Sequence, residues 1–461
     1  MSLPRDPLDA ASRLAGRRHR VVLASGSDAD GLGRWSFAAC DPAQTIEAWG
    51  TRVIVRGDRG ELIWQGDADP FEVLTERARE AGAQRAHEGP PVPVAIGYLG
   101  YDLARVLEPS ARWSPPEGAQ RSLPDMHVGI YGAVWRADRM TGEAAVIGDD
   151  PRARAALEVA LAAPGRGGEA PVFGTLAPAD DPAGDRYRER FARVKAYIRA
   201  GDVYQINLAR RLVAPIVHDG DALALLAALS SRAPAAYGAL IETDYGRVLS
   251  ASPERFLARA SGERRLETRP IKGTRRRTGD PARDHQIAAE LASDEKEQAE
   301  HLMIVDLERN DLGRVAEIGS VRVDSLARVV ELPTLYHLVS TVSCELRADA
   351  GTADILRATF PSGSITGAPK VRAMEIIDEL EDGCRGVYTG AIGYLGKGDA
   401  LDLSIAIRTA LLTGGKAHIH VGGGVVADSQ ADRELEETEE KTAAWRRALD
   451  ALSRSAAAAA R

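Results

Sequence analysis

The chain has 461 residues, of which 44% are hydrophobic and 27% are charged, and this composition is typical of a soluble globular protein. The length predicts about two to four domains and excludes a small scaffold held together by disulfides. No apolar run approaches the roughly 20 residues of a membrane span. The formal net charge of −8 disfavours nucleic acid as a partner, because such binding depends on a basic surface.

The three cysteines, Cys40, Cys344 and Cys384, are scattered along the chain and match no metal-ligand spacing. An odd number of scattered cysteines is typical of reduced thiols. We therefore expect a cytoplasmic protein without a structural disulfide. We expect neither a membrane nor a nucleic acid among its partners.

Short strand-like runs between Gly and Asp turns fill the chain from residue 21 to about 146, for example at 51–56 and 62–64. They predict antiparallel hairpins, with one helix near 71–81. The stretch 162–184 is rich in Gly, Pro and Ala without periodicity, which predicts a linker. We therefore divide the sequence into an N-terminal region (1–165), a linker (166–184), a second domain (185–452) and a tail (453–461).

Beyond the linker, apolar residues at helical spacing predict a helix over 185–200 that ends before Gly201. A strand over 203–214 follows it. We predict further strands at 246–252, 388–395, 403–411 and 417–421, and helices at 283–311, 369–381 and 433–453. This mixture predicts an α+β fold with much antiparallel sheet.

A lysine flanked by proline and glycine stands out in the segment 268–275, which reads TRPIKGTR. Lys272 is either a solvated loop charge or a nucleophile. A nucleophilic lysine must be desolvated or close to another cation, so that it loses its proton at neutral pH. Arg269 and Arg275 supply nearby cations, and the segment by itself leaves both interpretations open.

Two acidic helices each carry a pair of glutamates on one face. Glu297 and Glu300 are three residues apart, and so are Glu434 and Glu437, with Lys441 one turn further on. Two such pairs facing each other would suit Mg²⁺, which is held by one or two carboxylates and keeps several waters. The alternative is a pair of solvated helix faces.

Two glycine-containing segments are candidates for binding anions. The segment 361–370, PSGSITGAPK, leads into a helix with Pro369 near its start, where free backbone N–H groups suit an anion. It is no ATP loop, because Ala368 stands where that motif requires lysine. Gly422 to Gly424 form a predicted loop after the strand at 417–421, which either lets backbone amides approach a ligand or makes a tight turn.

Nine segments in one order resemble the chorismate-utilising enzymes. They are GDVYQINLARR (201–211), SPERFL (252–257), TRPIKGT (268–274), AEHLMIVDLERNDLGRV (299–315), LYHLVSTV (335–342), PSGSITGAPKVRAM (361–374), YTGAIGYL (388–395), SIAIRT (404–409) and 421–441. RWSFAACDP (34–42) and GYLGYD (97–102) extend the resemblance into the N-terminal region. It is specific to the large subunits of aminodeoxychorismate and anthranilate synthases. It implies an α+β fold, a large antiparallel two-sheet β-sandwich wrapped by helices.

Two positions separate the members of this family. Lys272 resembles the aminodeoxychorismate synthases, whereas anthranilate synthases usually carry alanine there. At Gln205, members that add water to chorismate have a lysine. The resemblance therefore implies ammonia as the nucleophile and 4-amino-4-deoxychorismate as the product, on the route to p-aminobenzoate and folate.

The resemblance also implies a mechanism. It places Glu300 and Glu437 on Mg²⁺, with Glu297 and Glu434 as outer or water-mediated partners. Glu254 would be the general acid that protonates the departing C4 hydroxyl, while neutral Lys272 attacks C2. Ammonia would then add at C4 and expel the lysine.

Chorismate carries two carboxylates, so the pocket needs cationic and N–H groups. By resemblance, Arg408 and Tyr388 hold the enolpyruvyl carboxylate, since an arginine fork fits a planar carboxylate. The ring carboxylate would meet Lys441 and the amides of Gly422 and Gly423. The remaining pocket positions implied by the family are Gly273, Thr274 and His337.

No glutaminase motif is present, so we expect ammonia from a separate glutaminase subunit and a separate lyase acting downstream. The segment at Leu23, Ala24 and Ser25 lacks the glutamate of the tryptophan-binding L-L-E-S segment, which argues against tryptophan feedback. Two alternatives stay open. One is the large subunit of an anthranilate synthase, and the other is a non-catalytic subunit that binds chorismate or a glutaminase.

Overall fold

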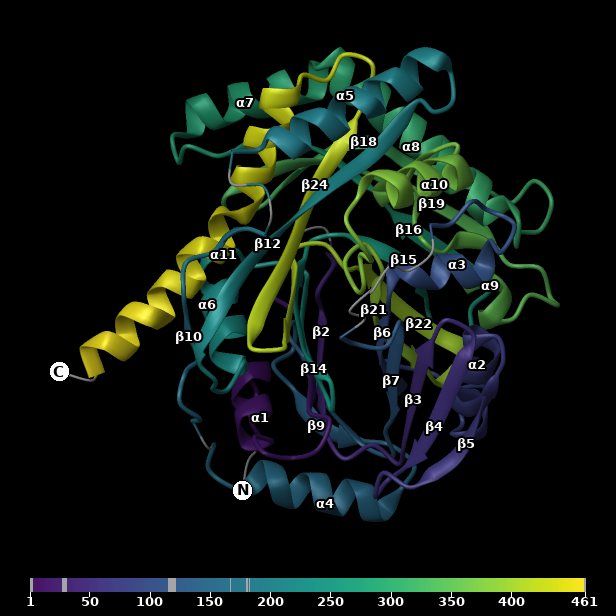
Figure 1. The fold of residues 1–461 in the computed structure, drawn as a ribbon. Helices are drawn as coiled ribbons and strands as arrows, with labels where there is room; N and C mark the ends of the chain where they lie inside the picture. Colours follow the sequence, from purple (N-terminus) through teal and green to yellow (C-terminus); the bar gives the residue numbers. More distant parts are fainter. Residues whose placement is uncertain are drawn as a thin grey trace.

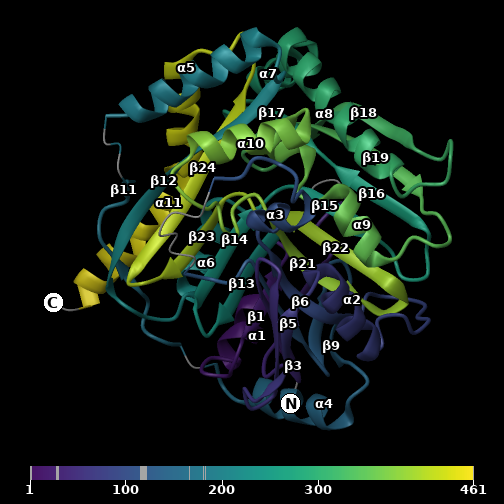
Figure 2. The same ribbon diagram turned by 45° about the vertical axis from the view of Figure 1, so that its right-hand side comes forward.

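The computed structural model describes residues 3–26, 31–114, 122–165, 167–179, 181 and 183–459. It contains two large antiparallel sheets that face each other, with helices around them, as Figures 1 and 2 show. The predicted α+β class and two-sheet core wrapped by helices are confirmed.

The first sheet has its strands in the order β10 (Val172–Phe173), β12 (Gln205–His218), β24 (Lys416–Val425), β23 (Thr409–Thr413), β14 (Gly246–Ser252), β13 (Tyr237–Thr243), β1 (Val21–Ala24), β2 (Trp35–Ala39), β8 (Val134–Asp138) and β9 (Ala144–Ile147). Two short strands also pair with β12, namely β11 (Ala177–Pro178) and β20 (Gly367–Ala368). The long partners β12 and β24 run side by side in Figure 1.

The second sheet has the order β17 (Ile271–Arg276), β19 (Leu335–Glu345), β16 (Arg265–Arg269), β15 (Arg255–Arg259), β22 (Ala400–Ile405), β21 (Ala391–Gly396), β6 (Pro93–Leu99), β7 (Met126–Ile130), β3 (Gln44–Trp49), β4 (Arg52–Gly57) and β5 (Leu62–Asp67). The strand β18 (Arg322–Glu331) pairs with β19. Every pairing in the two sheets is antiparallel, as the hairpin signals predict.

The helices are α1 (Pro7–Arg13), α2 (Pro70–Glu80), α3 (Ala104–Leu107), α4 (Pro151–Ala162), α5 (Asp185–Ala200), α6 (Leu223–Arg232), α7 (Pro281–Ser293), α8 (Glu295–Gly313), α9 (Thr352–Thr359), α10 (Lys370–Leu380) and α11 (Ala431–Ala459). Short 3₁₀ turns are η2 (Tyr101–Leu103), η3 (Gly363–Ile365) and η4 (Lys397–Asp399). Helices α6 and α11 pack on the first sheet, whereas α2, α8 and α9 pack on the second.

Each of the two sheets contains strands from both predicted regions of the sequence. Strand β1 pairs with β13, and β6 pairs with β21, so N-terminal strands complete sheets built mainly from the second region. Within the predicted linker, β10 and β11 pair with β12. The boundary at 166–184 thus divides the sequence but neither sheet, and α11 continues through the predicted tail to Ala459.

Side chains from both sheets meet in the layer between them. The rings of Phe37 on β2 and Tyr394 on β21 lie 5.1 Å apart at 64°, in an edge-on contact across that layer. Ile96, Val248 and Phe37 are all at most 2% exposed. Burying each such side chain contributes about 1.5–3 kcal/mol, so this layer holds the sheets together.

Several predicted elements are confirmed and others are wrong in detail. The helix over 185–200 is α5, and Gly201 ends it with a φ of 81°. The helix predicted over 283–311 is two helices, because Asp294 interrupts it and caps α8 by accepting a hydrogen bond from the Glu297 amide. The strand predicted over 403–411 is also two strands, β22 and β23, and Arg408 between them has a φ of 51°.

The predicted loop at Gly422 to Gly424 is wrong, because these residues lie inside β24. They pair with Ala209, Leu208 and Asn207 of β12, and this long-range pairing extends the strand through the glycines. Cys40, Cys344 and Cys384 form no disulfide bond, as expected. Across the described ranges, we find no helix that is both long and apolar enough to pass through a bilayer.

Candidate active site

A β-bulge directs Lys272 inward from β17. The pairing of β17 with β19 shifts by one residue between Lys272 and Thr274. Gly273 lies in this bulge with a φ of 60°, a left-handed conformation that glycine adopts readily. Lys272 is partly buried, and its Nζ donates a hydrogen bond to the Ser364 carbonyl oxygen at 3.4 Å.

Lys272 has no ion-pair partner within 4.0 Å among the residues that the structure describes. Burial lowers the pKa of Lys272, although the negative charges of Glu254 and Glu300 act in the opposite direction. Loss of water around an ammonium group favours its neutral form. This lysine therefore has the environment that a nucleophilic amine requires.

Glu254 lies where β15 begins and is 4% exposed. Its Oε1 accepts hydrogen bonds from Ser364 Oγ at 2.9 Å and from the Ile271 amide at 3.3 Å. Burial raises the pKa of Glu254 to about 7, against the opposing charge of Lys272. The carboxyl group is thus partly protonated at neutral pH, as a general acid must be.

Arg408 is a cation without a partner in the same pocket. Among the described residues, its guanidinium makes no hydrogen bond and no ion pair. Its positive charge is one cause of the low pKa of His337, after burial, and that pKa is about 4. A free guanidinium beside a neutral histidine is a suitable partner for a carboxylate ligand.

The hydrogen bonds and packing contacts differ among Thr274, His337 and Tyr388. Thr274 Oγ1 and His337 Nδ1 lie 2.9 Å apart in a hydrogen bond, while His337 Nε2 is buried without a partner. Tyr388 is 4% exposed and stacks on His420 with ring centroids 5.5 Å apart. Among the described residues, Tyr388 and Arg408 share no hydrogen bond, so the structure does not join this predicted pair directly.

The glutamates of α8 and α11 affect one another across the pocket. Burial raises the pKa of Glu300, and the charges of Glu297 and Glu434 raise it further. Burial likewise raises the pKa of Glu434, with a contribution from Glu437. Gly423 lies against this cluster, because a Cβ added there would stand 3.2 Å from Glu434 Oε2 and 3.6 Å from Glu437 Oε1.

Most of these glutamates have cationic partners. Arg275 lies 3.0 Å from Glu297, Lys296 lies 3.6 Å from Glu300, and Lys441 lies 2.6 Å from Glu437. Within the described part of the chain, no three His, Cys, Asp or Glu side chains converge as metal ligands. Magnesium needs only one or two carboxylates plus waters, and mutually repelling glutamates have the donor chemistry that suits it.

Lys441 is anchored at the edge of this cluster. Its Nζ donates to the Gly422 carbonyl oxygen at 2.7 Å besides pairing with Glu437. The glycines of β24 keep space open beside it, since a Cβ at Gly423 would stand 3.7 Å from Lys441 Nζ. The lysine, the glycine strand and the α11 glutamates thus line one side of the pocket.

The loop at 361–370 contacts two buried carboxyl groups of the protein itself. Its Ser364 amide donates to the buried carboxylate of Glu308 at 3.3 Å, and Ser364 Oγ donates to Glu254. The anion site suggested by the N–H groups near Pro369 stays a prediction. Sequence reasoning missed Ser364 and Glu308, since nothing in their local spacing links residues 56 positions apart.

Gln205 is fully buried beside the pocket, and both polar atoms of its amide lack a hydrogen-bond partner. A Cβ added at Gly424 would stand 3.1 Å from Gln205 Cδ, so the amide lies directly against the glycine strand. Leaving a buried amide unpaired costs free energy, and such groups concentrate at functional sites.

The chain is similar to known proteins over most of its length. Residues 22–447 match the sequence profile of a family described as chorismate binding enzyme. The chain is 41% identical to aminodeoxychorismate synthase component 1 of Klebsiella aerogenes over 451 residues, covering 96% of each chain. It is 42% identical to an anthranilate synthase component 1 of Haloarcula marismortui over 473 residues, covering 96% of this chain and 90% of that one.

Among solved structures, the chain resembles anthranilate synthase component I from Streptococcus pneumoniae TIGR4. The TM-score is 0.76 at 31% sequence identity, and the match covers 89% of this chain and 92% of the other. The likeness therefore extends over most of both chains.

Proposed function

Because the chain belongs to the chorismate binding enzyme family, we propose that it aminates chorismate to 4-amino-4-deoxychorismate, as component 1 of an aminodeoxychorismate synthase. The observation that carries this choice is Lys272, an inward-pointing lysine without an ion pair beside a raised-pKa carboxyl. Identity alone does not separate the two reactions, since it is 41% to one kind of relative and 42% to the other.

The first half of the reaction uses Lys272 and Glu254. The lone pair of neutral Lys272 forms a bond to C2 of chorismate, and both ring double bonds shift as the C4–O bond breaks. Glu254 gives its proton to the departing hydroxyl, which leaves as water. The enzyme then holds a cationic amine adduct and a Glu254 carboxylate.

In the second half, the lone pair of ammonia forms a bond to C4 while the bond between C2 and Lys272 breaks. The lysine leaves as a neutral amine. The new ammonium group gives one proton back to Glu254, which restores both residues for the next turnover. Two easier substitutions replace one difficult one, and the overall change is chorismate plus ammonia to aminodeoxychorismate plus water.

Binding would use the cations that the pocket leaves available. Arg408 has no partner and would take the enolpyruvyl carboxylate, with Tyr388 packed nearby. The ring carboxylate would meet Lys441 and the backbone of Gly422 and Gly423. Thr274 and His337 would contact the substrate from the β17 side.

We assign Mg²⁺ to the glutamates of α8 and α11. Glu300 and Glu437 would hold it directly, with Glu297 and Glu434 acting through water. When bound, the ion supplies a Lewis acid for charge at the ring carboxylate. The raised pKa of Glu300, to which the charge of Glu434 contributes, supports this assignment, because a divalent cation would relieve the repulsion between the two carboxylates.

The same proposal implies partners and a location. The component 1 relatives suggest that a separate glutaminase subunit supplies ammonia to this chain. A separate lyase would convert the product to p-aminobenzoate for folate synthesis. We place the activity in the cytoplasm, where the three cysteine thiols would stay reduced.

Product analysis tests the proposal. Purified protein with chorismate, Mg²⁺ and an ammonium salt should form aminodeoxychorismate, and Lys272→Ala should lower kcat on the order of 10⁴-fold or more, as loss of a nucleophile does. Lys416→Ala, at an exposed lysine, is the matched control and should retain activity. Formation of anthranilate and pyruvate by both the native chain and Lys272→Ala would refute the proposal.

A further inference from the structure

A second buried carboxyl group lies behind the catalytic acid and takes no part in the reaction described above. Glu308, on α8, is 1% exposed. It accepts hydrogen bonds from Ser362 Oγ at 2.8 Å, the Ser364 amide at 3.3 Å and Thr268 Oγ1 at 3.4 Å. Burial raises the pKa of Glu308, whereas its three donors and Lys370 favour the charged form.

Two serine hydroxyls join Glu308 to Glu254. Ser362 Oγ, which donates to Glu308, lies 3.2 Å from Ser364 Oγ, and Ser364 Oγ donates to Glu254 at 2.9 Å. None of these four side chains is more than 4% exposed. Each serine hydroxyl carries one proton, so when Glu254 is protonated the chain can run from the Glu254 hydroxyl to Ser364, from Ser364 to Ser362 and from Ser362 to Glu308, through protein groups alone.

Other charged groups face the two carboxyls from each neighbouring element. Lys272 of β17 and Arg408 act on Glu254, while Lys370 of α10 acts on Glu308. Asp311 of α8 pairs with Lys370 and adds negative charge near Glu308. Since Glu308 has three donors and Glu254 has two, a single proton shared by the pair resides preferentially on Glu254.

We propose that Glu308 is a positioning residue for the amination: through Ser362 and Ser364 it carries the negative charge of a linked carboxyl pair and thereby keeps Glu254 protonated. The proposal rests on the assignment of Glu254 as general acid. After proton transfer the Ser364 hydroxyl donates to Glu254, as it does in the structure, and so stabilises the carboxylate that remains.

Glu308→Gln removes the charge and keeps the shape. With its negative neighbour gone, Glu254 should lose its proton at lower pH. In the profile of kcat against pH, we expect the alkaline limb to move to lower pH by about one unit. At a fixed pH on that limb, kcat should therefore fall about tenfold. Asp306→Asn is the matched control, because Asp306 is an exposed carboxylate on the same helix, and it should leave the limb in place.

Infrared difference spectroscopy of the substrate-free protein makes the test independent of turnover. The band of the protonated Glu254 carboxyl, assigned by its absence in Glu254→Gln, should titrate at lower pH in Glu308→Gln than in the native chain. An unchanged titration would overturn the inference even if the enzyme aminates chorismate. A shifted titration in a protein without amination activity would instead count against the proposed function alone.

Ser362→Ala offers a second route if Glu308→Gln fails to fold. Loss of the 2.8 Å bond from Ser362 weakens the preference of Glu308 for the charged form, so Glu308 competes better for the shared proton. The Glu254 band should again titrate at lower pH. A band that titrates as in the native chain would contradict the linkage.

Discussion

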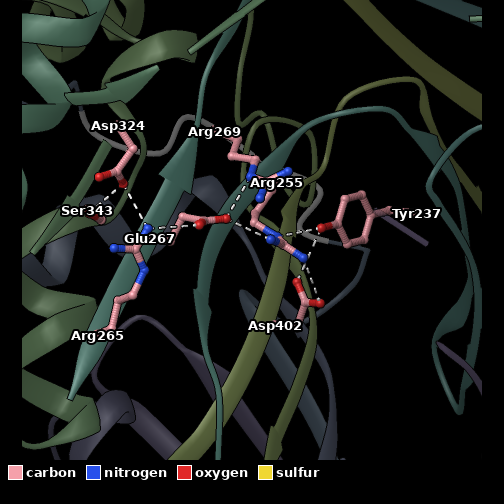
Figure 3. A network of polar contacts seen from close by, with 8 residues as sticks. All are labelled: Tyr237, Arg255, Arg265, Glu267, Arg269, Asp324, Ser343 and Asp402. Carbon is pink, nitrogen blue, oxygen red and sulfur yellow. Dashed lines mark hydrogen bonds and ion pairs between the residues drawn. The ribbon is translucent and has the colours of Figure 1, made fainter. Parts of the chain in front are cut away.

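Two neighbouring residues at the start of β15 face opposite surroundings. Glu254 faces the pocket, whereas Arg255 faces a polar network behind it, shown in Figure 3. Arg255 donates to Tyr237 Oη at 2.7 Å, to Glu267 Oε1 at 2.9 Å and to Asp402 Oδ2 at 3.4 Å. Its guanidinium thus has partners on β13, β16 and β22.

The network behind β15 is balanced in charge. Besides Arg255, it contains Arg269 and Arg265, which both contact Glu267, and Arg265 also pairs with Asp324 at 2.7 Å. Three arginines therefore meet three acids, and the figure shows these contacts spanning several strands. Paired charges of this kind stabilise a single arrangement of the strands that carry them.

The pocket side is the opposite. Lys272 and Arg408 make no ion pair among the described residues, and Gln205 leaves both amide atoms unpaired. Charges and polar atoms that the protein leaves without partners are available to a substrate. The difference teaches that the side chains behind β15 pair with one another for structure, whereas several groups on the pocket side are left unpaired for chemistry.

A bulge in β15 follows these two residues. The pairing of β15 with β16 and with β22 shifts just after Arg255. Such a bulge redirects side chains, and Arg255 ties the strand to both neighbours at that point. We infer that the balanced network fixes the direction in which Glu254 enters the pocket.

Removing the acid should break the chemistry and leave the network intact. Glu254→Gln should lower kcat by about 10²–10⁴-fold, the usual contribution of a general acid. Unfolding in urea should be cooperative in the variant, because the Arg255 contacts do not involve the Glu254 side chain. Retention of more than a tenth of the native kcat would contradict the acid assignment.

The unfolding free energy of the same variant should depend on pH less strongly than that of the native chain. The pKa of Glu254 rises from 4.5 to about 7 on folding, so between these values the folded state holds a proton that the unfolded state has released. The contribution of the Glu254 carboxyl group to the unfolding free energy is therefore fully present below pH 4.5, and it declines as the pH rises through about 7. Glu254→Gln should show a smaller loss of unfolding free energy over this range than the native chain.

Arg255→Met should have its main effect on stability. It leaves Glu267 and Asp402, 13% and 26% exposed, without their central cation. Breaking a buried pair from one side costs about 3–5 kcal/mol of unfolding free energy, which urea denaturation would measure. The matched control, Arg259→Met, lies on the same strand and should cost less, because Arg259 bonds to the exposed loop carbonyl of Glu263. Equal losses would contradict the special role of Arg255.

Local patterns predicted some of this arrangement. Apolar spacing and Gly201 were sufficient to define α5, and the flanking Pro270 and Gly273 marked Lys272 as unusual. Glu297 and Glu300 share a helix face by spacing alone. Each of these signals lies within a few residues of the feature that it predicts, which is why it could be found in the sequence.

Other features depend on contacts that local patterns do not contain. Helical periodicity continues through Asp294, so the break between α7 and α8 could be found only from its cap on Glu297. Three glycines look like a loop until pairing with β12 makes them part of β24. The link from Glu308 to Ser362 joins residues 54 positions apart, and folding alone brings them together.

The outer end of the balanced network, the pair of Arg265 and Asp324, should contribute least to the unfolding free energy. The Arg265 side chain is 41% exposed and pairs with Asp324, which is 33% exposed. Exposed pairs contribute about 0.2–1 kcal/mol, so Arg265→Ala should lower the unfolding free energy by no more than about 1 kcal/mol. The difference from the native chain should shrink further at high salt, and kcat should stay near the native value. A loss as large as that of Arg255→Met would mean that the exposed pair, and not Arg255, holds β15 in place.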